Sequence, residues 1–142
     1  MRTVLFCLFS LSALAGYAQT APPLAVPADA VARLEDVKET TKQVVVTKAT
    51  KARLQAETRP EVNRLLVLAA DDFVRITAAG KPTREAYLQA LDKNLAGLAP
   101  LTTDEQDRRQ VAEYFQELLE IVGIPSSEGR LTAFALSPAP KQ

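Results

Sequence analysis

Residues 104–125 read DEQDRRQVAEYFQELLEIVGIP and hold the strongest secondary-structure signal in the chain. Acidic residues open the segment, in the turn where the helix dipole stabilises negative charge. Six apolar residues then recur at intervals of three and four, the spacing of one helix face: Val111, Tyr114, Phe115, Leu118, Leu119 and Val122. This pattern predicts an amphipathic helix over residues 104–122.

Both ends of this helix have clear sequence signals. Thr103 and Gln106 have the spacing of a capping box, in which side chains satisfy the first free N–H groups of a helix. At the other end, Gly123 is followed by Ile124 and Pro125, which predicts a helix stop with Gly123 at positive φ. We therefore expect Gly123 to have a structural role.

Two segments before this helix have the same periodicity. Residues 61–79 present one apolar face and stop at Gly80: Val62, Leu65, Leu66, Ala69, Phe73 and Ile76. Residues 84–97 follow Thr83, a good capping residue, and present a second face: Tyr87, Leu88, Leu91, Leu95 and Leu98. Both segments are expected to be helices.

The chain ends with a shorter helical pattern. Ser126 or Ser127 can cap a last helix that continues to Leu136, because serine oxygens accept hydrogen bonds from free backbone N–H groups. Three residues are expected to face inward from this helix: Leu131, Phe134 and Leu136.

Residues 29–57 allow two structures. Their content of Ala, Lys, Glu, Arg and Gln favours a helix. Residues 40–47, TTKQVVVT, are dense in β-branched side chains and also fit a short strand. We expect a helix, because no second strand candidate is present to pair with this one.

The predicted class is therefore all-α, a small antiparallel bundle of about four to five helices in one domain over residues 29–136. A Pro/Ala-rich linker over residues 19–28 is expected to precede it, and a disordered tail over residues 137–142 to follow it. After a cut at residue 18, 124 of the 142 residues remain, enough for one domain with a core.

Residues 1–18 have the three parts of a cleaved signal peptide. Arg2 gives a positive start, residues 4–14 are apolar but too short to span a bilayer, and small residues precede Gln19. The only cysteine, Cys7, lies within this segment, and the bulky residues before it do not fit a lipid-anchored cysteine. We expect an exported protein, periplasmic or secreted.

Composition excludes several classes of function. The chain has no histidine, so a Ser-His-Asp or Cys-His site and the usual zinc sites cannot form. Removal of Arg2 leaves 16 basic and 17 acidic residues, a balance that offers no attraction to nucleic acid. No glycine-rich phosphate loop and no later apolar segment of transmembrane length are present. We expect no cofactor.

Carboxylates are the remaining candidates for chemistry. Asp71 and Asp72 interrupt an apolar helix and could bind a metal or act as acid and base, or they could lie on its solvated edge. Neighbours in a helix point about 100° apart, which favours the solvated edge. Three glutamates form a row on the predicted helix over residues 104–122: Glu113, Glu117 and Glu120. This row could bind a cation or a basic partner, or it could be the solvated face of the helix. We predict no metal site.

Three other features have ordinary structural explanations. Ser126 and Ser127 lack a histidine base, so helix capping explains them better than nucleophilic catalysis. Lysines and threonines over residues 38–51 could form a polar binding face, or a membrane-surface helix, although acidic neighbours and the lack of aromatic anchors disfavour the latter. Tyr87 and Tyr114 have core spacing.

The carboxy-terminal part resembles a family of small bacterial domains, the domain of unknown function 4844. The resemblance rests on three stretches, TTDEQDR at 102–108, YFQEL at 114–118 and IVGIPSSEGRL at 121–131, and is strongest over the last third of the chain. A family aromatic near the end would correspond to Phe134. The resemblance implies a helical domain, often exported, with no assigned activity, and it implies no catalytic residue.

These observations favour a non-enzymatic protein that binds a partner protein outside the cytoplasm, in an inhibitor-like or immunity-like role. The alternative is a carboxylate-based enzyme or metal-dependent module that uses Asp71, Asp72 or the row from Glu113 to Glu120. Convergence of these carboxylates in one pocket would favour the enzyme. A carrier of apolar ligands is a third possibility, and an enclosed apolar cavity would support it.

Overall fold

The computed structural model describes residues 23–44 and 59–137. Within these ranges the chain is all-helical and contains no strand. The elements are five α-helices and one short 3-10 helix: α1 Ala30–Val44, α2 Arg59–Ala78, α3 Arg84–Leu98, η1 Ala99–Leu101, α4 Glu105–Ile121 and α5 Arg130–Leu136. The predicted all-α class is confirmed for this part of the chain.

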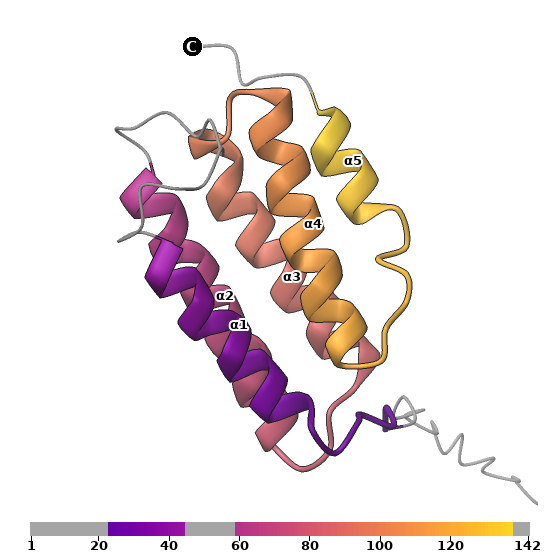
Figure 1. Cartoon of the computed structure of the whole chain (residues 1–142). Helices are drawn as coiled ribbons and strands as arrows, with labels where there is room; N and C mark the ends of the chain where they lie inside the picture. Colours follow the sequence, from indigo (N-terminus) through magenta and orange to yellow (C-terminus); the bar gives the residue numbers. More distant parts are fainter. Residues whose placement is uncertain (1–22, 45–58, 138–142) are drawn as a thin grey trace, which may run out of the picture.

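The long helices lie side by side, with α1 against α2 and the short α5 along α4 (Figure 1). Helix α2 also packs against α3, and α1 touches α4. The apolar faces predicted from periodicity meet between these helices. Their largest fully buried side chains include Phe73 from α2, Tyr87 from α3 and Phe115 from α4.

The segment before α1 is packed onto the bundle. Leu24 donates a backbone hydrogen bond of 2.8 Å to the carbonyl of Pro82, in the turn after α2. The side chains of Leu24 and Val26 are partly buried against the core. Residues 23–28, although rich in proline and alanine, therefore contribute to the domain.

Helix α1 agrees with the expected helix over its described part. Residues 40–44 are helical, and the remainder of the predicted helix, residues 45–57, lies outside the described residues. Thr41 is buried, and its hydroxyl is satisfied there because it donates to the carbonyl of Val37 at 2.8 Å. Val31 is 39% exposed, since it lies about 100° around the helix from the buried Ala30.

The start of α4 differs from the capping box predicted for Thr103. Asp104 is the N-cap, in an extended conformation, and its carboxylate accepts a 2.7 Å hydrogen bond from the backbone of Gln106. Both Thr and Asp are good N-caps, so spacing alone did not separate them. At α3 the prediction is confirmed, because the Thr83 hydroxyl accepts from the backbone of Ala86 at 3.2 Å.

The stop after α4 is confirmed in detail. Gly123 has φ +81°, and its N–H donates to the carbonyl of Glu120 at 3.1 Å. The N–H of Ile124 donates to the carbonyl of Leu119 at 2.8 Å, which completes a Schellman motif. Ile124 is fully buried, so the turn returns an apolar side chain to the core.

The last helix corrects two expectations. It begins at Arg130, later than Ser126 or Ser127, and Gly129 is its N-cap residue with φ +83°. Leu131 and Phe134 are buried, as expected, but Leu136 is 66% exposed. Because Leu136 lies two positions beyond Phe134, it points about 200° away from the buried face.

None of the described helices is long and apolar enough to cross a membrane. The predicted signal peptide, residues 1–18, lies outside the described residues.

Candidate functional site

An open groove of about 360 Å³ runs between α4 and α5. Its apolar lining comes from both helices, and its polar rim comes mainly from α4. The lining residues are Arg109, Ala112, Glu113, Gln116, Leu131, Thr132, Ala135 and Leu136. Apolar walls with a few polar groups at the edge are typical of a binding surface.

Small side chains line part of this groove. Ala112 on α4 and Ala135 on α5 both contribute to its lining. Leu131 is buried at one end and Leu136 is largely exposed at the other. The seven residues of α5 thus place one leucine in the core and leave another on the groove wall.

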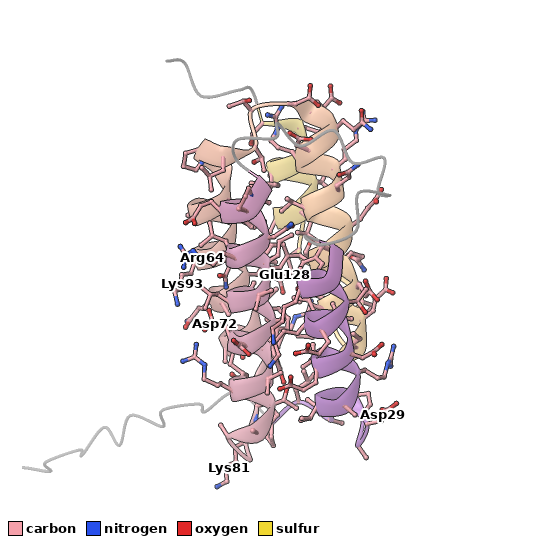
Figure 2. All side chains as sticks on the ribbon, turned by 60° about the vertical axis from the view of Figure 1, so that its left-hand side comes forward. Asp29, Arg64, Asp72, Lys81, Lys93 and Glu128 are labelled. Atoms are coloured by element: carbon pink, nitrogen blue, oxygen red, sulfur yellow. The ribbon has the colours of Figure 1, made fainter. Side chains whose placement is uncertain are left out.

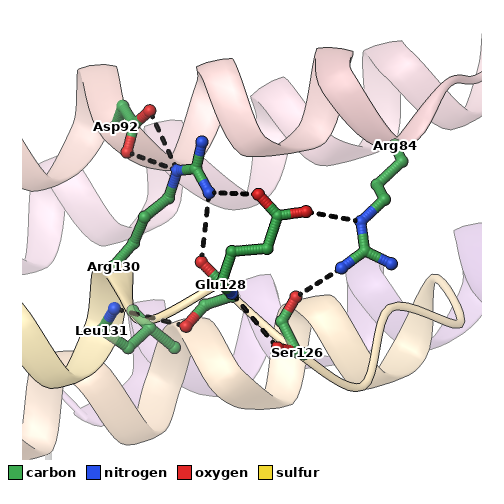
Figure 3. Close-up of polar contacts among 7 residues, drawn as sticks. Arg84, Asp92, Ser126, Glu128, Arg130 and Leu131 are labelled. Atoms are coloured by element: carbon green, nitrogen blue, oxygen red, sulfur yellow. Dashed lines mark hydrogen bonds and ion pairs between the residues drawn. The ribbon is translucent and has the colours of Figure 1, made fainter.

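A cluster of ion pairs holds α5 and its preceding loop against α3 (Figure 3). Arg130 pairs with Asp92 on α3 at 3.0 Å and with Glu128 at 2.9 Å. Arg84, at the start of α3, pairs with Glu128 at 3.1 Å and donates to the carbonyl of Ser126 at 3.2 Å. We call these four charged residues, Arg84, Asp92, Glu128 and Arg130, the α3–α5 clasp.

The backbone of the clasp is strained at one position. Glu128 has φ +56°, a left-handed conformation that disfavours residues with a Cβ, and Gly129 follows at φ +83°. The pKa of Glu128 is lowered by its hydrogen bond with Arg130, and the pKa of Arg130 is raised chiefly by Glu128. The ion pairs therefore accompany a backbone shape that glutamate does not itself prefer.

The two serines of this loop accept hydrogen bonds from backbone N–H groups. The Ser127 hydroxyl accepts from the N–H of Leu131 at 3.3 Å, and the Ser126 hydroxyl accepts from the N–H of Glu128 at 3.2 Å. These bonds support the predicted structural role of the serines, although neither residue is the N-cap of α5.

The neighbouring carboxylates Asp71 and Asp72 serve different interfaces. Asp71 accepts a 3.0 Å hydrogen bond from Lys38 and so joins α2 to α1. Asp72 faces α3, where it accepts from Lys93 at 3.3 Å and from Asn94 at 3.1 Å. Figure 2 shows Asp72 and Lys93 along one edge of the molecule. The 100° step between helix neighbours separates the two carboxylates, as expected.

The three glutamates predicted to form a row on α4 also lie in different environments. Glu113 lines the α4–α5 groove, whereas Glu117 lines a different groove between α1 and α4. Glu120 accepts a 2.8 Å hydrogen bond from the side chain of Gln116. These carboxylates do not converge in one pocket. Within residues 23–44 and 59–137, no group of three acidic, histidine or cysteine side chains is placed to hold a metal ion.

The polar face predicted over residues 38–51 is described only at its start. Lys38 pairs with Glu35 and Asp71, which raises the pKa of its ammonium group and leaves the side chain 13% exposed. Lys42 pairs with Glu39 at 2.5 Å. The rest of this predicted face lies outside the described residues.

The tyrosines belong to the core, as their spacing predicted. Tyr87 is fully buried, and its hydroxyl lies 2.8 Å from that of Thr77 on α2. Tyr114 is half-buried, and its hydroxyl donates to the carbonyl of Leu66 at 3.0 Å. Burial raises the pKa of both groups, that of Tyr114 to about 12.

Two sets of residues were missed by sequence reasoning. The α3–α5 clasp unites residues about 40 positions apart, and no local pattern signals such pairing. Arg108 was assigned to no role but is buried and donates to the carbonyls of Thr102 and Thr103 at 3.1 and 2.9 Å. In the sequence it lies among charged and polar residues at the start of α4, so it resembles a surface residue.

Comparison with known proteins identifies the family. Residues 25–137 match the family described as Domain of unknown function (DUF4844), a match that extends well beyond the last third of the chain. No curated protein and no solved structure matches the chain. Since the matched region includes all five described helices, the chain belongs to this family of domains of unknown function.

Proposed function

We propose that this chain is an exported, non-enzymatic binding module, an antiparallel helical bundle that contacts a partner protein through the α4–α5 groove. The observation that carries the proposal is the exposure of Leu136 on the wall of an open, largely apolar groove. An inhibitor-like role is one form that such binding can take.

The groove is more informative than the exposed leucine alone. Single exposed apolar residues are common on protein surfaces. Here Leu136 continues an apolar lining formed by Ala112 and Ala135, and polar residues border that lining. An apolar centre with a polar rim is the usual anatomy of a protein–protein interface.

The placement of the carboxylates favours binding over carboxylate catalysis. A general acid and base must reach the same substrate, and a metal needs several ligands around one point. Asp71, Asp72 and Glu113 lie at three different places on the described bundle. The groove is also open, which favours a protein surface over an enclosed site for an apolar ligand.

Export is proposed from residues 1–18 alone. The positive start, the short apolar run and the small residues before Gln19 support a signal peptide. A partner would then be met outside the cytoplasm, in the periplasm or the medium.

Site-specific photocrosslinking tests the groove. A photoreactive amino acid at Thr132, on the groove, should trap a discrete protein partner in the native host. The same group at the exposed Lys81, which does not line the groove, should not trap it. Leu136→Asp should abolish the Thr132 product. Equal products from both positions would contradict the groove assignment.

Calorimetric titration tests the rival function. Calcium, magnesium, manganese and zinc should show no one-to-one binding to the purified protein. A stoichiometric site that Asp71→Asn or Asp72→Asn removes would replace the binding proposal with a metal-dependent one.

A further inference from the structure

Among the described residues, a small set of contacts holds α5 in place. The helix has seven residues, fewer than an isolated helix needs to persist in water, so its structure depends on packing. Two of its side chains, Leu131 and Phe134, are buried in the shared core. Of the described helices, it packs mainly along α4 (Figure 1). The position of α5 therefore depends chiefly on two apolar side chains and on the α3–α5 clasp.

The clasp joins this helix to α3 through side chains that water reaches. Arg130 and Asp92 are 31% and 55% exposed, and Arg84 and Glu128 are 38% and 50% exposed. Ion pairs at this exposure are screened by salt and stabilise a structure only weakly. Both links to α3 reach the first residue of α5 or the loop before it (Figure 3). The attachment to α3 is thus electrostatic and sensitive to the solvent.

The loop before α5 has the conformation of a hinge under strain. Ile124 is fully buried and fixes the chain where the α4 stop ends. Glu128 and Gly129 then follow with φ of +56° and +83°. The left-handed conformation is unfavourable for Glu128, and release of α5 would relieve it. Backbone strain therefore favours release, whereas the ion pairs of the clasp favour attachment.

We propose that residues 126–136 form a strap that opens from α3 and α4 while the other helices stay folded, and that the clasp sets how often it opens. The strap then opens more readily than the whole domain unfolds, because it has few buried contacts. Salt increases the open population, because it weakens the clasp. Opening withdraws one wall of the α4–α5 groove, which consists of Leu131, Thr132, Ala135 and Leu136.

Opening of the strap regulates the groove, a consequence that rests on the proposed function. Because α5 supplies one wall, a partner bound in the groove holds the strap closed and slows its opening. The opening itself needs no partner and can be measured on the purified protein.

Hydrogen exchange followed by NMR at increasing, sub-denaturing urea tests the strap. The amide of Ala133, which donates to the carbonyl of Gly129 at 2.9 Å, reports on α5, and the amide of Phe73 reports on the middle of α2. Protection of Ala133 should be at least about tenfold lower and nearly independent of urea, because local opening exposes little surface. Protection of Phe73 should fall with the slope of global unfolding. Equal protection and equal slopes would overturn the proposal.

Variants of the clasp separate opening of the strap from fraying of the helix end. Arg84→Gln and Asp92→Asn cut the two links to α3, and each should lower the protection of Ala133 about two- to fivefold. Arg64→Gln is the matched control, since it removes an exposed arginine that pairs with Glu61 of its own helix, and it should leave Ala133 unchanged. Equal effects of the control and the clasp variants would contradict a role for the clasp.

Salt provides a second readout. At about 0.5 M sodium chloride the protection of Ala133 should fall in the parent but not in the double variant Arg84→Gln/Asp92→Asn, which has no link left to screen. A salt effect of the same size in both proteins would overturn the inference.

The outcomes for the strap and for the proposed function are independent. A strap that opens as expected, together with failed photocrosslinking from Thr132, would support this inference and contradict the groove as a partner site. Exchange of α5 only by global unfolding, together with successful photocrosslinking, would overturn the strap and leave the proposed function standing.

Discussion

The hydroxyl of Tyr114 in α4 donates a 3.0 Å hydrogen bond to the backbone carbonyl of Leu66 in α2, across 48 positions of sequence. Burial raises the pKa of Tyr114 from 10.0 to about 12, since the phenolate is poorly solvated there. The folded protein therefore holds this proton more tightly than the unfolded chain does. The stability that results is complete below pH 10 and is lost as pH rises toward 12.

Tyr114 is thus predicted to make the domain sensitive to alkali. Denaturant melts of the parent should show a falling free energy of unfolding above pH 10, with Tyr87 and Lys38 contributing in the same direction because their pKa values are also raised. Tyr114→Phe should lose about 1 kcal/mol at pH 7, through the missing hydrogen bond, and should show a smaller alkaline loss. An identical pH dependence in both proteins would contradict the assignment.

Gly123→Ala is predicted to destabilise the protein by about 1 kcal/mol or more. The cause is the positive φ of +81°, which strains a residue that has a Cβ. A steric clash is not the cause, since an added Cβ would meet its nearest neighbours, Ala25 and Pro27, at ordinary contact distances of 3.6 and 3.7 Å. Gly97→Ala is the matched control: it is helical and open, so it should stabilise by about 0.5–1 kcal/mol. Urea melts measure both, and equal midpoints would show that the turn tolerates a side chain.

Asp72 is predicted to stabilise the α2–α3 interface. Its side chain is 12% exposed and accepts hydrogen bonds from Lys93 and Asn94 on α3. Asp72→Ala should reduce the free energy of unfolding by about 1 kcal/mol, since it removes the hydrogen bonds that join α2 to α3. Glu113→Ala, which removes an exposed carboxylate, should change it by less than about 0.5 kcal/mol. Similar losses in both variants would show that Asp72 has no special role.

The left-handed backbone at Glu128 predicts an unusual order of variant stabilities. Glu128→Ala and Glu128→Gly both lose the ion pairs with Arg84 and Arg130, but only glycine relaxes the strain at φ +56°. The glycine variant should therefore have the higher denaturation midpoint.

The same pair of variants has an expected pH dependence. Arg130 lowers the pKa of Glu128, so the contribution of the carboxylate is present above its unfolded value of 4.5 and is lost as pH falls below it. The difference in free energy of unfolding between the parent and Glu128→Ala should narrow in acid. A difference that widens in acid would contradict this expected direction.

Export is predicted to leave a protein that begins at Gln19, because the small residues at positions 16 and 18 precede this bond. Intact mass spectrometry of the protein recovered outside the cytoplasm measures this directly. A species that retains residues 1–18, or one with lipid on Cys7, would contradict the proposed signal.

Local patterns predicted the helices well. The apolar faces of α3 and α4 needed only the spacing of neighbouring residues, and the positive φ of Gly123 followed from the order Gly-Ile-Pro. The prediction was less accurate where two residues were chemically equivalent, as with Thr103 and Asp104 at the start of α4. It was wrong for Leu136, because a seven-residue helix is too short for its periodicity to define a face.

The candidate site could not be predicted in the same way. The groove lies where α5 packs along α4, and its lining includes Ala112 and Ala135, two residues that carry no distinctive signal in the sequence. The loop before α5 is joined to α3 by the pairing of Arg84 with Glu128, and α5 itself by the pairing of Arg130 with Asp92. No short-range pattern encodes these partners.

The sequence by itself determined the helical class, the buried faces and the stop at Gly123, since hydrogen bonding within a helix and the conformational freedom of glycine act over a few residues. The tertiary structure alone decided which carboxylates face α1, α3 or the groove, and it left Leu136 exposed beside Glu113. Those outcomes depend on how helices distant in sequence pack together, where burial and charge pairing are shared among side chains that no local spacing relates.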